Sequence, residues 1–425
     1  MKRDSTIYRT YVEILRSELI CAMGCTEPIA LAYCAATARA ALGALPDRIV
    51  VEASGNIIKN VKSVVVPNTG GRRGIAAAAA IGALAGDETA QLQVISHVGD
   101  EAKAKLGDYL EQTPVEVRPL TSNCLLDMIV TVYRGDSHAR ARIANEHTNI
   151  VLVERDGTVL LQKDEQAPAE AQALDYSLLT VEDIYDFAHT CDLDDVRDTL
   201  DRQIEMNTAI ADEGLRHDYG ANIGKVLLKT SDNLRTRAKA YAAAGSDARM
   251  NGCELPVVIC SGSGNQGLTA SLPIVVYARE LGSDRDTLYR ALLISNLVTL
   301  HEKSGIGRLS AYCGAVSAGA GAGAGIAYLY GGDLSDIAHT IVNALAITSG
   351  IVCDGAKSSC AAKIATAVET GIFGYEMYQN GQQFLAGDGL VLKGVENSIR
   401  NFGRLARIGM RETDQEIIRM MTDNP

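Results

Sequence analysis

GAVSAGAGAGAGIAYLYGG, residues 314–332, decides whether the C-terminal part of the chain is continuously helical or is interrupted by a linker. Its low complexity is compatible with a flexible linker, whereas its alanines favour a buried helix. The same interpretation is favoured by the apolar residues at its end, which are Ile326, Tyr328, Leu329 and Tyr330. Each glycine inside a helix costs about 1 kcal/mol relative to alanine. We therefore expect close helix packing, or approach to a cofactor, to offset that cost.

Helical patterns surround this stretch from about residue 178 almost to the end of the chain. TVEDIYDFAHT begins with a capping threonine and has Glu182 in its first turn. Longer helical patterns cover residues 284–303 and 334–350, and Gly350 stops the second of them. We therefore expect an all-helical domain over residues 175–425.

The N-terminal residues 1–45 predict a pair of helices. Apolar residues recur at helical spacing over residues 5–22, and Ser5 suits the N-cap position. A second helix is expected to start near Pro28, a residue suited to a first helical turn. We expect this pair to pack on the helical domain.

Residues 46–165 have the pattern of a smaller α+β domain with a mainly antiparallel sheet. RIVVEASGNIIKNVKSVVVP (48–67) has two β-branched runs around Gly55–Asn56, which predicts a strand pair. A helical stretch at 74–86 follows, and then strand-like segments at 115–120, 126–134, 139–147, 148–157 and 158–163. The polar, alanine-rich stretch 162–176 is the expected boundary. The predicted fold class is therefore α+β with a helical majority.

Composition excludes several classes of protein. The chain has 425 residues, 47% of them hydrophobic, and a formal net charge of −12. A nucleic-acid binder needs a basic face, so the acidic charge argues against one. No window has the ~18 apolar residues of a membrane span, and the N-terminus has no signal-peptide core. A cytoplasmic protein with no membrane partner is expected, and its glycine- and alanine-rich faces are compatible with a homodimer.

Ten cysteines in a cytosolic chain are not expected to form disulfides. Most lie in or beside apolar runs and are expected to be small buried hydrophobes. Four differ because glycine and small polar residues surround them, namely Cys25, Cys313, Cys353 and Cys360.

CDGAKSSC, residues 353–360, is the strongest candidate for a metal site. Seven positions along one helix separate two thiols by about 10 Å, too far for a compact centre. Gly355 can break the backbone and Asp354 can cap a new helix, so that Cys360 lies in its first turns. With Cys313, these cysteines could hold an iron–sulfur cluster with one open iron, or a zinc ion completed by His or water. Inert buried thiols remain the alternative.

MGCTEP, residues 23–28, places Cys25 at a helix start. The positive end of a helix lowers the pKa of a thiol and favours the thiolate. Cys25 could therefore be a base, a nucleophile or a labile fourth ligand. A helix-connecting turn with Glu27 as a first-turn acid is the alternative.

Other glycine-containing segments could hold a substrate. CSGSGNQG (260–267) follows a strand-like run, and its free amides could cradle a carboxylate or a phosphate, or simply form a turn. In HEKSGIGRLSAYCG (301–314), Lys303 and Arg308 could bind a carboxylate or move protons, or be solvated. The turns at 54–56 and 67–74 could face the same cleft.

The chain resembles the L-cysteine desulfidase family, which is related to the alpha part of bacterial iron–sulfur L-serine dehydratases. The resemblance lies in six motifs, in this order: GCTEP, SGNIIKN, VPNTGGRRG, SGSGNQG, KSGIGRLSAYCGA and CDGAKSSC. It extends from GCTEP to GMRETDQEII near the C-terminus. The last two cysteines are spaced more closely than in the serine dehydratases, and there is no C-terminal cysteine tail. Both departures favour the desulfidase branch.

This resemblance implies an oxygen-sensitive [4Fe–4S] cluster held by Cys313, Cys353 and Cys360. It also implies β-elimination from L-cysteine to give sulfide, ammonia and pyruvate, with L-serine dehydration as the alternative. We expect Cys25 to be the base or a displaced ligand, and Lys303 to assist. The expected substrate-binding residues are Asn56, Asn68, Ser261, Ser263, Gly264, Asn265, Gln266 and Arg308.

Three other functions stay open at this point. A pyridoxal-phosphate lyase could use SGSGNQG as its phosphate loop, although only Lys225 and Lys229 are nominal Schiff-base lysines. A non-catalytic iron–sulfur redox sensor would have the cluster without turnover. A zinc-stabilised protein would have no cluster at all.

Overall fold

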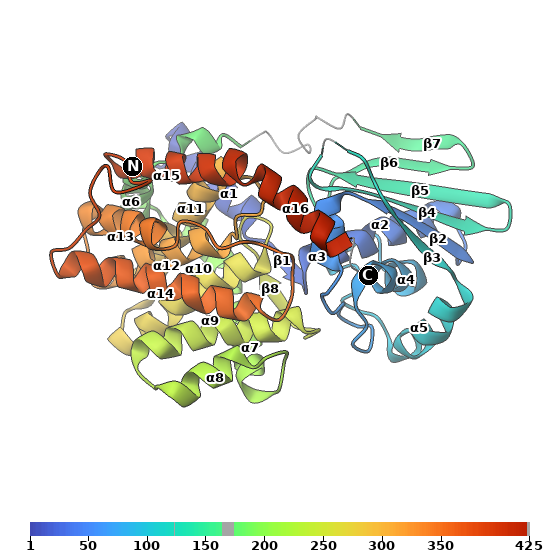
Figure 1. Cartoon of the computed structure of the whole chain (residues 1–425), viewed down its shortest axis with the longest axis horizontal. Coiled ribbons are helices and arrows are strands. Elements are labelled where there is room, and N and C mark those ends of the chain that lie inside the picture. Colours follow the sequence, from blue (N-terminus) through green and yellow to red (C-terminus); the bar gives the residue numbers. More distant parts are fainter. Residues whose placement is uncertain (123, 164–173, 423–425) are drawn as a thin grey trace.

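Helix α12 (Ala315–Leu329) lies inside a layer of other helices, and every residue from Ala315 to Ala327 is buried. The computed structural model describes residues 1–122, 124–163 and 174–422. Figure 1 shows α12 within the helical lobe, on the opposite side of the molecule from the large sheet. Its neighbours are α10 (Gly264–Leu281), α11 (Arg285–Ile306), α13 (Leu334–Ile347) and α14 (Cys360–Gln379). The predicted buried helix is therefore confirmed.

The glycines of α12 allow two helices to approach its backbone closely. A Cβ atom on Gly319 would lie 2.3 Å from the carbonyl oxygen of Ala367, and one on Gly323 would lie 2.4 Å from that of Gly371. These contacts advance by four residues on both helices, so α12 and α14 run parallel. On another side, a Cβ on Gly321 would lie 2.5 Å from the Ser295 carbonyl oxygen of α11. Close helix packing is thus the reason for the glycines.

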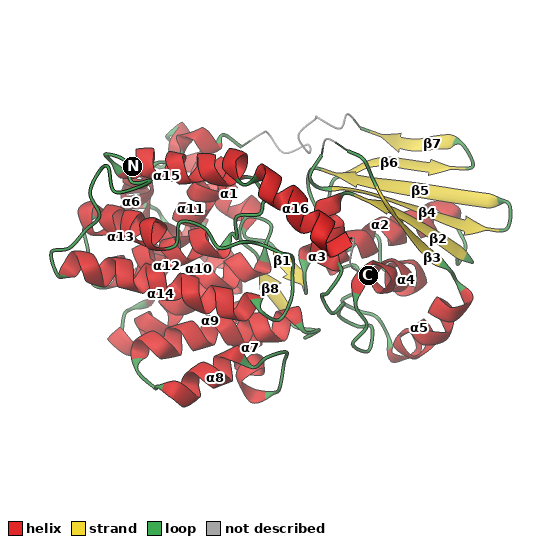
Figure 2. Cartoon of the chain, viewed as in Figure 1, coloured by secondary structure: helices red, strands yellow, loops and turns green. Residues whose placement is uncertain are grey.

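The remaining helices and two short strands complete this lobe (Figure 2). Ser5 caps the first helix by accepting a hydrogen bond from the Tyr8 amide at 3.2 Å. That helix is shorter than predicted, because Cys21–Met23 instead pairs antiparallel with a strand far along the chain. The elements are α1 (Thr6–Glu18), β1 (Cys21–Met23), α6 (Val181–Thr190), α7 (Arg197–Arg216), α8 (Ile223–Thr230), α9 (Leu234–Met250), β8 (Pro256–Val258) and α15 (Val395–Arg404). The last helix, α16 (Arg411–Thr422), extends from this lobe and packs on α3 (Gly55–Val61) (Figure 1).

The second lobe is a six-stranded sheet in the order β3-β2-β4-β5-β6-β7. Only β2 and β3 pair in parallel, so the predicted mainly antiparallel sheet and the α+β class are confirmed. One face is covered by α2 (Thr26–Leu42) and α4 (Gly74–Ala85), and α5 (Asp100–Gln112) packs on α4. The strands are β2 (Arg48–Ala53), β3 (Val115–Pro119), β4 (Asp127–Arg134), β5 (Ser137–Ala144), β6 (Ile150–Arg155) and β7 (Thr158–Gln162).

The predicted strand pair at 48–67 is wrong in its second half. Gly55–Val61 forms helix α3, and Val65 contributes only an isolated bridge to Arg73. The spacing of the buried residues is that of a helix and not of a strand. Ile57 and Val61, four residues apart, are both fully buried, as on one face of a helix. The opposite face carries Lys59, whose Nζ donates to Asp414 of α16 at 2.6 Å.

The two N-terminal helices pack on different lobes. Tyr8 and Tyr11 of α1 meet Phe187 of α6 edge to face, with ring centroids 5.2 and 5.3 Å apart. Helix α2 instead lies on the sheet. The expected boundary at 162–176 falls largely outside the described residues. No helix in the described part of the chain has the length and apolarity needed to cross a membrane.

The contact between α12 and α14 leaves no room for a methyl group. We expect Gly323→Ala to lower the free energy of unfolding by about 1–3 kcal/mol, because the clash with the Gly371 carbonyl outweighs alanine's helix propensity. The midpoint of urea unfolding measures the change. Gly305→Ala is the matched control, since its nearest neighbour would be an ordinary 3.8 Å away. Equal midpoints for wild type and Gly323→Ala would contradict this packing.

Candidate active site

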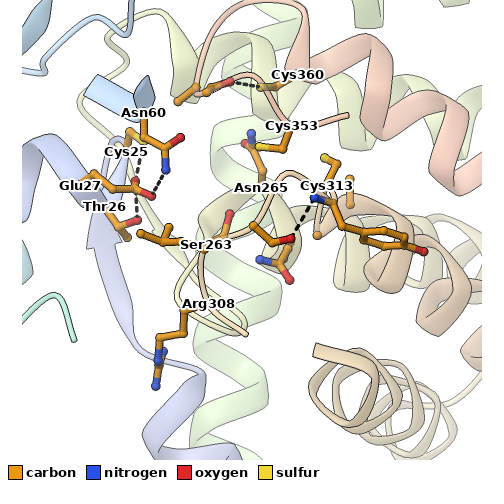
Figure 3. Close-up of a pocket in the computed structure, with 18 of the residues that line it drawn as sticks. Cys25, Thr26, Glu27, Asn60, Ser263, Asn265, Arg308, Cys313, Cys353 and Cys360 are labelled. Carbon is orange, nitrogen blue, oxygen red and sulfur yellow. Dashed lines mark hydrogen bonds between the residues drawn. The ribbon is translucent and has the colours of Figure 1, made fainter. Parts of the chain in front are cut away.

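A cavity of about 110 Å³ lies where the starts of α2, α10, α12 and α14 meet. Figure 3 shows side chains from these separate segments directed toward one another. Most residues that the sequence singles out line it: Cys25, Ser263, Asn265, Gln266, Lys303, Arg308, Cys313, Cys353 and Cys360. Residues from sequence motifs near both ends of the chain therefore line the same cavity.

Two of the candidate ligands are joined by a short antiparallel backbone contact. Tyr312 and Val352 form an isolated bridge. On either side of it, the Cys313 amide donates to the Ile351 carbonyl at 2.9 Å, and the Cys353 amide donates to the Ala311 carbonyl at 2.6 Å. This bridge holds the segment before α12 beside the segment before α14.

The third cysteine is the first residue of α14. The break that precedes it occurs at Gly355, which has φ 90° and whose Cβ, if present, would lie 2.3 Å from the Lys59 carbonyl oxygen. The expectation that Asp354 caps the new helix is wrong. Its carboxylate instead pairs with Lys357 and with Lys363, the latter at 2.5 Å. The spacing of these residues in the sequence does not predict that both lysines pair with Asp354.

The thiols of Cys313 and Cys353 influence each other's ionisation. The hydrogen bond from Cys313 lowers the pKa of Cys353 to about 6, with Lys59 and Lys363 adding to the effect and burial opposing it. The same hydrogen bond, together with burial, raises the pKa of Cys313 well above its usual value. Cys360 lies close enough for its charge to act on Cys313. One thiolate is thus favoured among three neighbouring sulfurs, and thiolates are the ligands of iron–sulfur clusters.

Within residues 1–122, 124–163 and 174–422, no three His, Cys, Asp or Glu side chains converge closely enough to hold one metal ion. A cluster makes a different demand, because each cysteine binds a different iron atom. The grouping of the three cysteines on one cavity wall is therefore compatible with cluster ligands, whereas in the described part of the chain they do not form a single-ion zinc site.

Cys25 does not have the environment expected of a base. Burial and the nearby Glu27 carboxylate raise the pKa of this thiol well above its usual value, and the charge of Arg249 and the backbone amide of Glu27 oppose them. Its Sγ donates to Glu27 Oε2 at 3.1 Å. The predicted stabilisation of the thiolate by the start of α2 is therefore outweighed. Cys25 nevertheless packs in one small apolar cluster with Cys360, so it stands next to the candidate ligands.

Glu27 is a feature of the site that the sequence analysis treated as a plain first-turn acid. It is buried, and its Oε1 accepts a hydrogen bond from Asn60 at 3.0 Å. Burial acts to raise its pKa, but the neighbouring imidazole of His147 and the Cys25 thiol hold that pKa well below the usual range. The cavity wall therefore carries a buried negative charge. The motif GCTEP contained the signal, because it places Glu27 beside Cys25.

Lys303 and Arg308 both line the cavity but differ in their partners. Burial lowers the pKa of Lys303 to about 8, while the charges of Cys353 and Cys313 oppose that shift. Arg308 donates to Glu18 at 3.1 Å and faces Glu146 at 3.8 Å. The positive charge of Arg308 is thus already paired with carboxylates of the protein. Lys303 instead lies near the thiols of Cys353 and Cys313.

The SGSGNQG turn leads into the start of α10. Ser261 and Gly262 have positive φ values of 50° and 72°, and the helix begins at Gly264. A Cβ on Gly267 would lie 2.1 Å from the Val258 carbonyl oxygen, so the turn packs against the short strand β8. Ser261 lies in a neighbouring cavity that shares Lys303 and Arg308 with this one.

Arg249, which has no motif around it in the sequence, also lines the cavity. It is only 2% exposed, and its Nη1 donates to Asn265 Oδ1 at 3.1 Å. Its position at the end of α9 becomes visible only in the fold, because that helix end meets the start of α10.

Four predicted substrate-binding residues do not line the cavity: Asn56, Asn68, Gly264 and, as just described, Ser261. Asn56 donates to Asp414 of α16 at 2.9 Å, and Asn68 donates to the Ile95 carbonyl at 2.7 Å. Both side chains are buried in structural contacts. The nominal Schiff-base lysines Lys225 and Lys229 lie on α8 and do not line it either.

The chain is similar to known proteins over most of its length. The family described as "Serine dehydratase alpha chain" matches residues 89–419. The "UPF0597 protein DSY1109" of Desulfitobacterium hafniense is 56% identical over 99% of this chain and 98% of its own. A "UPF0597 protein" of Finegoldia magna is 50% identical over 98% of this chain and 100% of its own. The extent of these matches shows that the chain belongs to the serine dehydratase alpha chain family.

Proposed function

We propose that this protein is an iron–sulfur-dependent β-elimination lyase that acts on L-cysteine and yields sulfide, ammonia and pyruvate. The observation that carries the proposal is the meeting of Cys313, Cys353 and Cys360 on the wall of a cavity that also holds Lys303 and Glu27. Membership of the serine dehydratase alpha chain family supports a lyase of this general type.

The three cysteines would hold a [4Fe–4S] cluster, which supplies a Lewis-acidic iron with an open coordination position. The other residues then have roles that follow from their environment. Glu27, ionised and buried, attracts the substrate ammonium group. Lys303, whose pKa of about 8 gives it a share of neutral amine near neutral pH, accepts the α-proton. The Cys25 thiol, kept protonated by its surroundings, donates a proton to the leaving sulfur.

This assignment balances the reaction. The α C–H bond breaks as its proton moves to Lys303, the Cα–Cβ double bond forms, and the Cβ–S bond breaks with its electron pair going to sulfur. Protonation of that sulfur releases sulfide. The aminoacrylate product then tautomerises and hydrolyses to pyruvate and ammonia. The roles given to Cys25 and Lys303 thereby revise the expectation that Cys25 is the base.

Sulfur as the leaving atom is favoured by the surroundings of Cys25. This residue and Cys360 pack with Val64, Met250 and Ala356 in an apolar cluster. An apolar wall accepts a thiol more readily than a hydroxyl, which needs hydrogen-bond partners when buried. L-serine dehydration is the second candidate, and the family match is the observation that favours it.

The proposal predicts anaerobic turnover of L-cysteine with sulfide and pyruvate formed in equal amounts, and loss of that turnover in air. Assays of both products with L-cysteine and with L-serine make the test. Faster release of pyruvate from L-serine would select the second candidate. Release from neither amino acid, by protein that contains its cluster, would contradict the lyase proposal.

Lys303→Met keeps the length of the side chain but removes the proton acceptor. We expect kcat for L-cysteine to fall about 100-fold or more while the iron content stays unchanged. Lys105→Met, which removes an exposed lysine paired with Glu101 on α5, is the matched control and should keep wild-type turnover. Wild-type kcat in Lys303→Met would rule out Lys303 as the base.

Cys25→Ser replaces the thiol by a weaker acid. We expect the variant to keep its iron and to lose at least ~10-fold in kcat, because proton donation to the leaving sulfur slows. Iron analysis and sulfide assays on the same sample separate the two effects. A variant with both full iron and full turnover would remove Cys25 from the reaction.

A further inference from the structure

The guanidinium of Arg249 is buried in the cavity wall without a negative partner from the protein. Its side chain is among the largest that are fully buried. Nη1 donates to the neutral Asn265 amide oxygen at 3.1 Å, and the buried Nε has no hydrogen-bond partner. Among the described residues, no Asp or Glu forms an ion pair with Arg249. A buried charge left in this state is strongly unfavourable, so an anion from outside the protein is required.

The other cations near this site have carboxylate partners or lie against thiols. Lys59, only 2% exposed, pairs with Asp414 at 2.6 Å. Arg308 pairs with Glu18. Lys303 is held near Cys353 and Cys313. Arg249 is the exception, which indicates that its partner is a ligand.

A second positive element points to the same place. Gly264, the first residue of α10, packs so closely on Arg249 that a Cβ there would lie 2.2 Å from Nε. The free amides and the positive end of α10 therefore begin beside the guanidinium. Gln266, in the first turn of that helix, is 5% exposed and also lines the cavity. A guanidinium and the positive end of a helix thus lie on one side of the cavity.

Glu27 does not supply the missing charge. Its two oxygens already accept hydrogen bonds from Asn60, Thr26 and Cys25. The imidazole of His147 faces it, with Nε2 4.0 Å from Oε1. These contacts are separate from Arg249, with which Glu27 forms no ion pair.

We propose that Arg249 binds the α-carboxylate of the substrate and so selects α-amino acids over amines that lack the carboxylate. This inference rests on the proposed function, because it names the anchor for the same substrate. Arg249 and Glu27 then recognise the two opposite charges of one zwitterion. The guanidinium positions the Cα–H bond and does not itself exchange a proton, because arginine stays protonated in proteins.

Two fragments of L-cysteine test this directly. 3-Mercaptopropionate keeps the thiol and the carboxylate, whereas cysteamine keeps the thiol and the ammonium group. Calorimetric titration of the anaerobically purified full chain measures the affinity for each. We expect Arg249→Gln to weaken binding of 3-mercaptopropionate about 30-fold or more, and to leave cysteamine binding unchanged.

Arg237→Gln is the matched control, because Arg237 lies on the same helix but is only partly buried and pairs with Glu280 at 2.6 Å. It should bind both fragments as wild type does. If Arg249→Gln fails to fold, judged by circular dichroism and iron content, Arg249→Lys replaces it and is expected to weaken only 3-mercaptopropionate. Wild-type affinity for 3-mercaptopropionate in the Arg249 variant, or no binding by wild type itself, would overturn the inference.

The binding experiment also separates this inference from the function on which it rests. Selective loss of 3-mercaptopropionate binding in a protein that turns over neither L-cysteine nor L-serine would keep the carboxylate anchor and reject the lyase. If the protein turns over L-cysteine but Arg249→Gln binds 3-mercaptopropionate as wild type does, the lyase is kept and the carboxylate anchor is rejected.

Discussion

The parallel backbone contact between α12 and α14 sets the geometry of the candidate active site. Gly319 lies against Ala367, and Gly323 lies against Gly371. Because the two helices run in the same direction and in this register, their starts lie at the same end of the pair. Cys313 directly precedes one start and Cys360 forms the other. The glycines that look like a linker in the sequence are therefore what brings two distant cysteines together.

Charged side chains on the cavity wall determine what this end of the helical lobe can bind. The guanidinium of Arg249 has no carboxylate partner on the cavity wall, which is unfavourable unless a ligand completes it. The ionised carboxylate of Glu27 and Lys303, whose pKa is lowered, lie on the same wall. A zwitterionic amino acid has a carboxylate for Arg249 and an ammonium group that Glu27 attracts. The stability given up by burying Arg249 unpaired is consistent with a binding role, because functional sites are where proteins tolerate such costs.

The sequence predicts those helices, strands and caps that depend on neighbouring residues in the chain. It does not predict features that depend on contacts between distant segments. Strands such as β2 and β4 follow from β-branched runs, and Ser5 marks its helix start because capping is local. The helix at Gly55–Val61 was missed because its short apolar run fits either period. Cysteines beside glycine could be singled out, but Arg249 could not, because its burial without a partner arises only where α9 meets α10. The pKa of Cys25 was misjudged since the carboxylate of Glu27 outweighs a helix end.

Cys313, Cys353 and Cys360 are proposed to act together as cluster ligands. Iron and acid-labile sulfide should be measured on anaerobically purified wild type, on the three single Cys→Ser variants, and on Cys21→Ser as a control from strand β1. The account predicts about four irons and four sulfides per chain for wild type and for the control. It predicts a clear loss of both in each of the three variants. Full iron in any of them, or wild type that contains zinc and no sulfide, would contradict it.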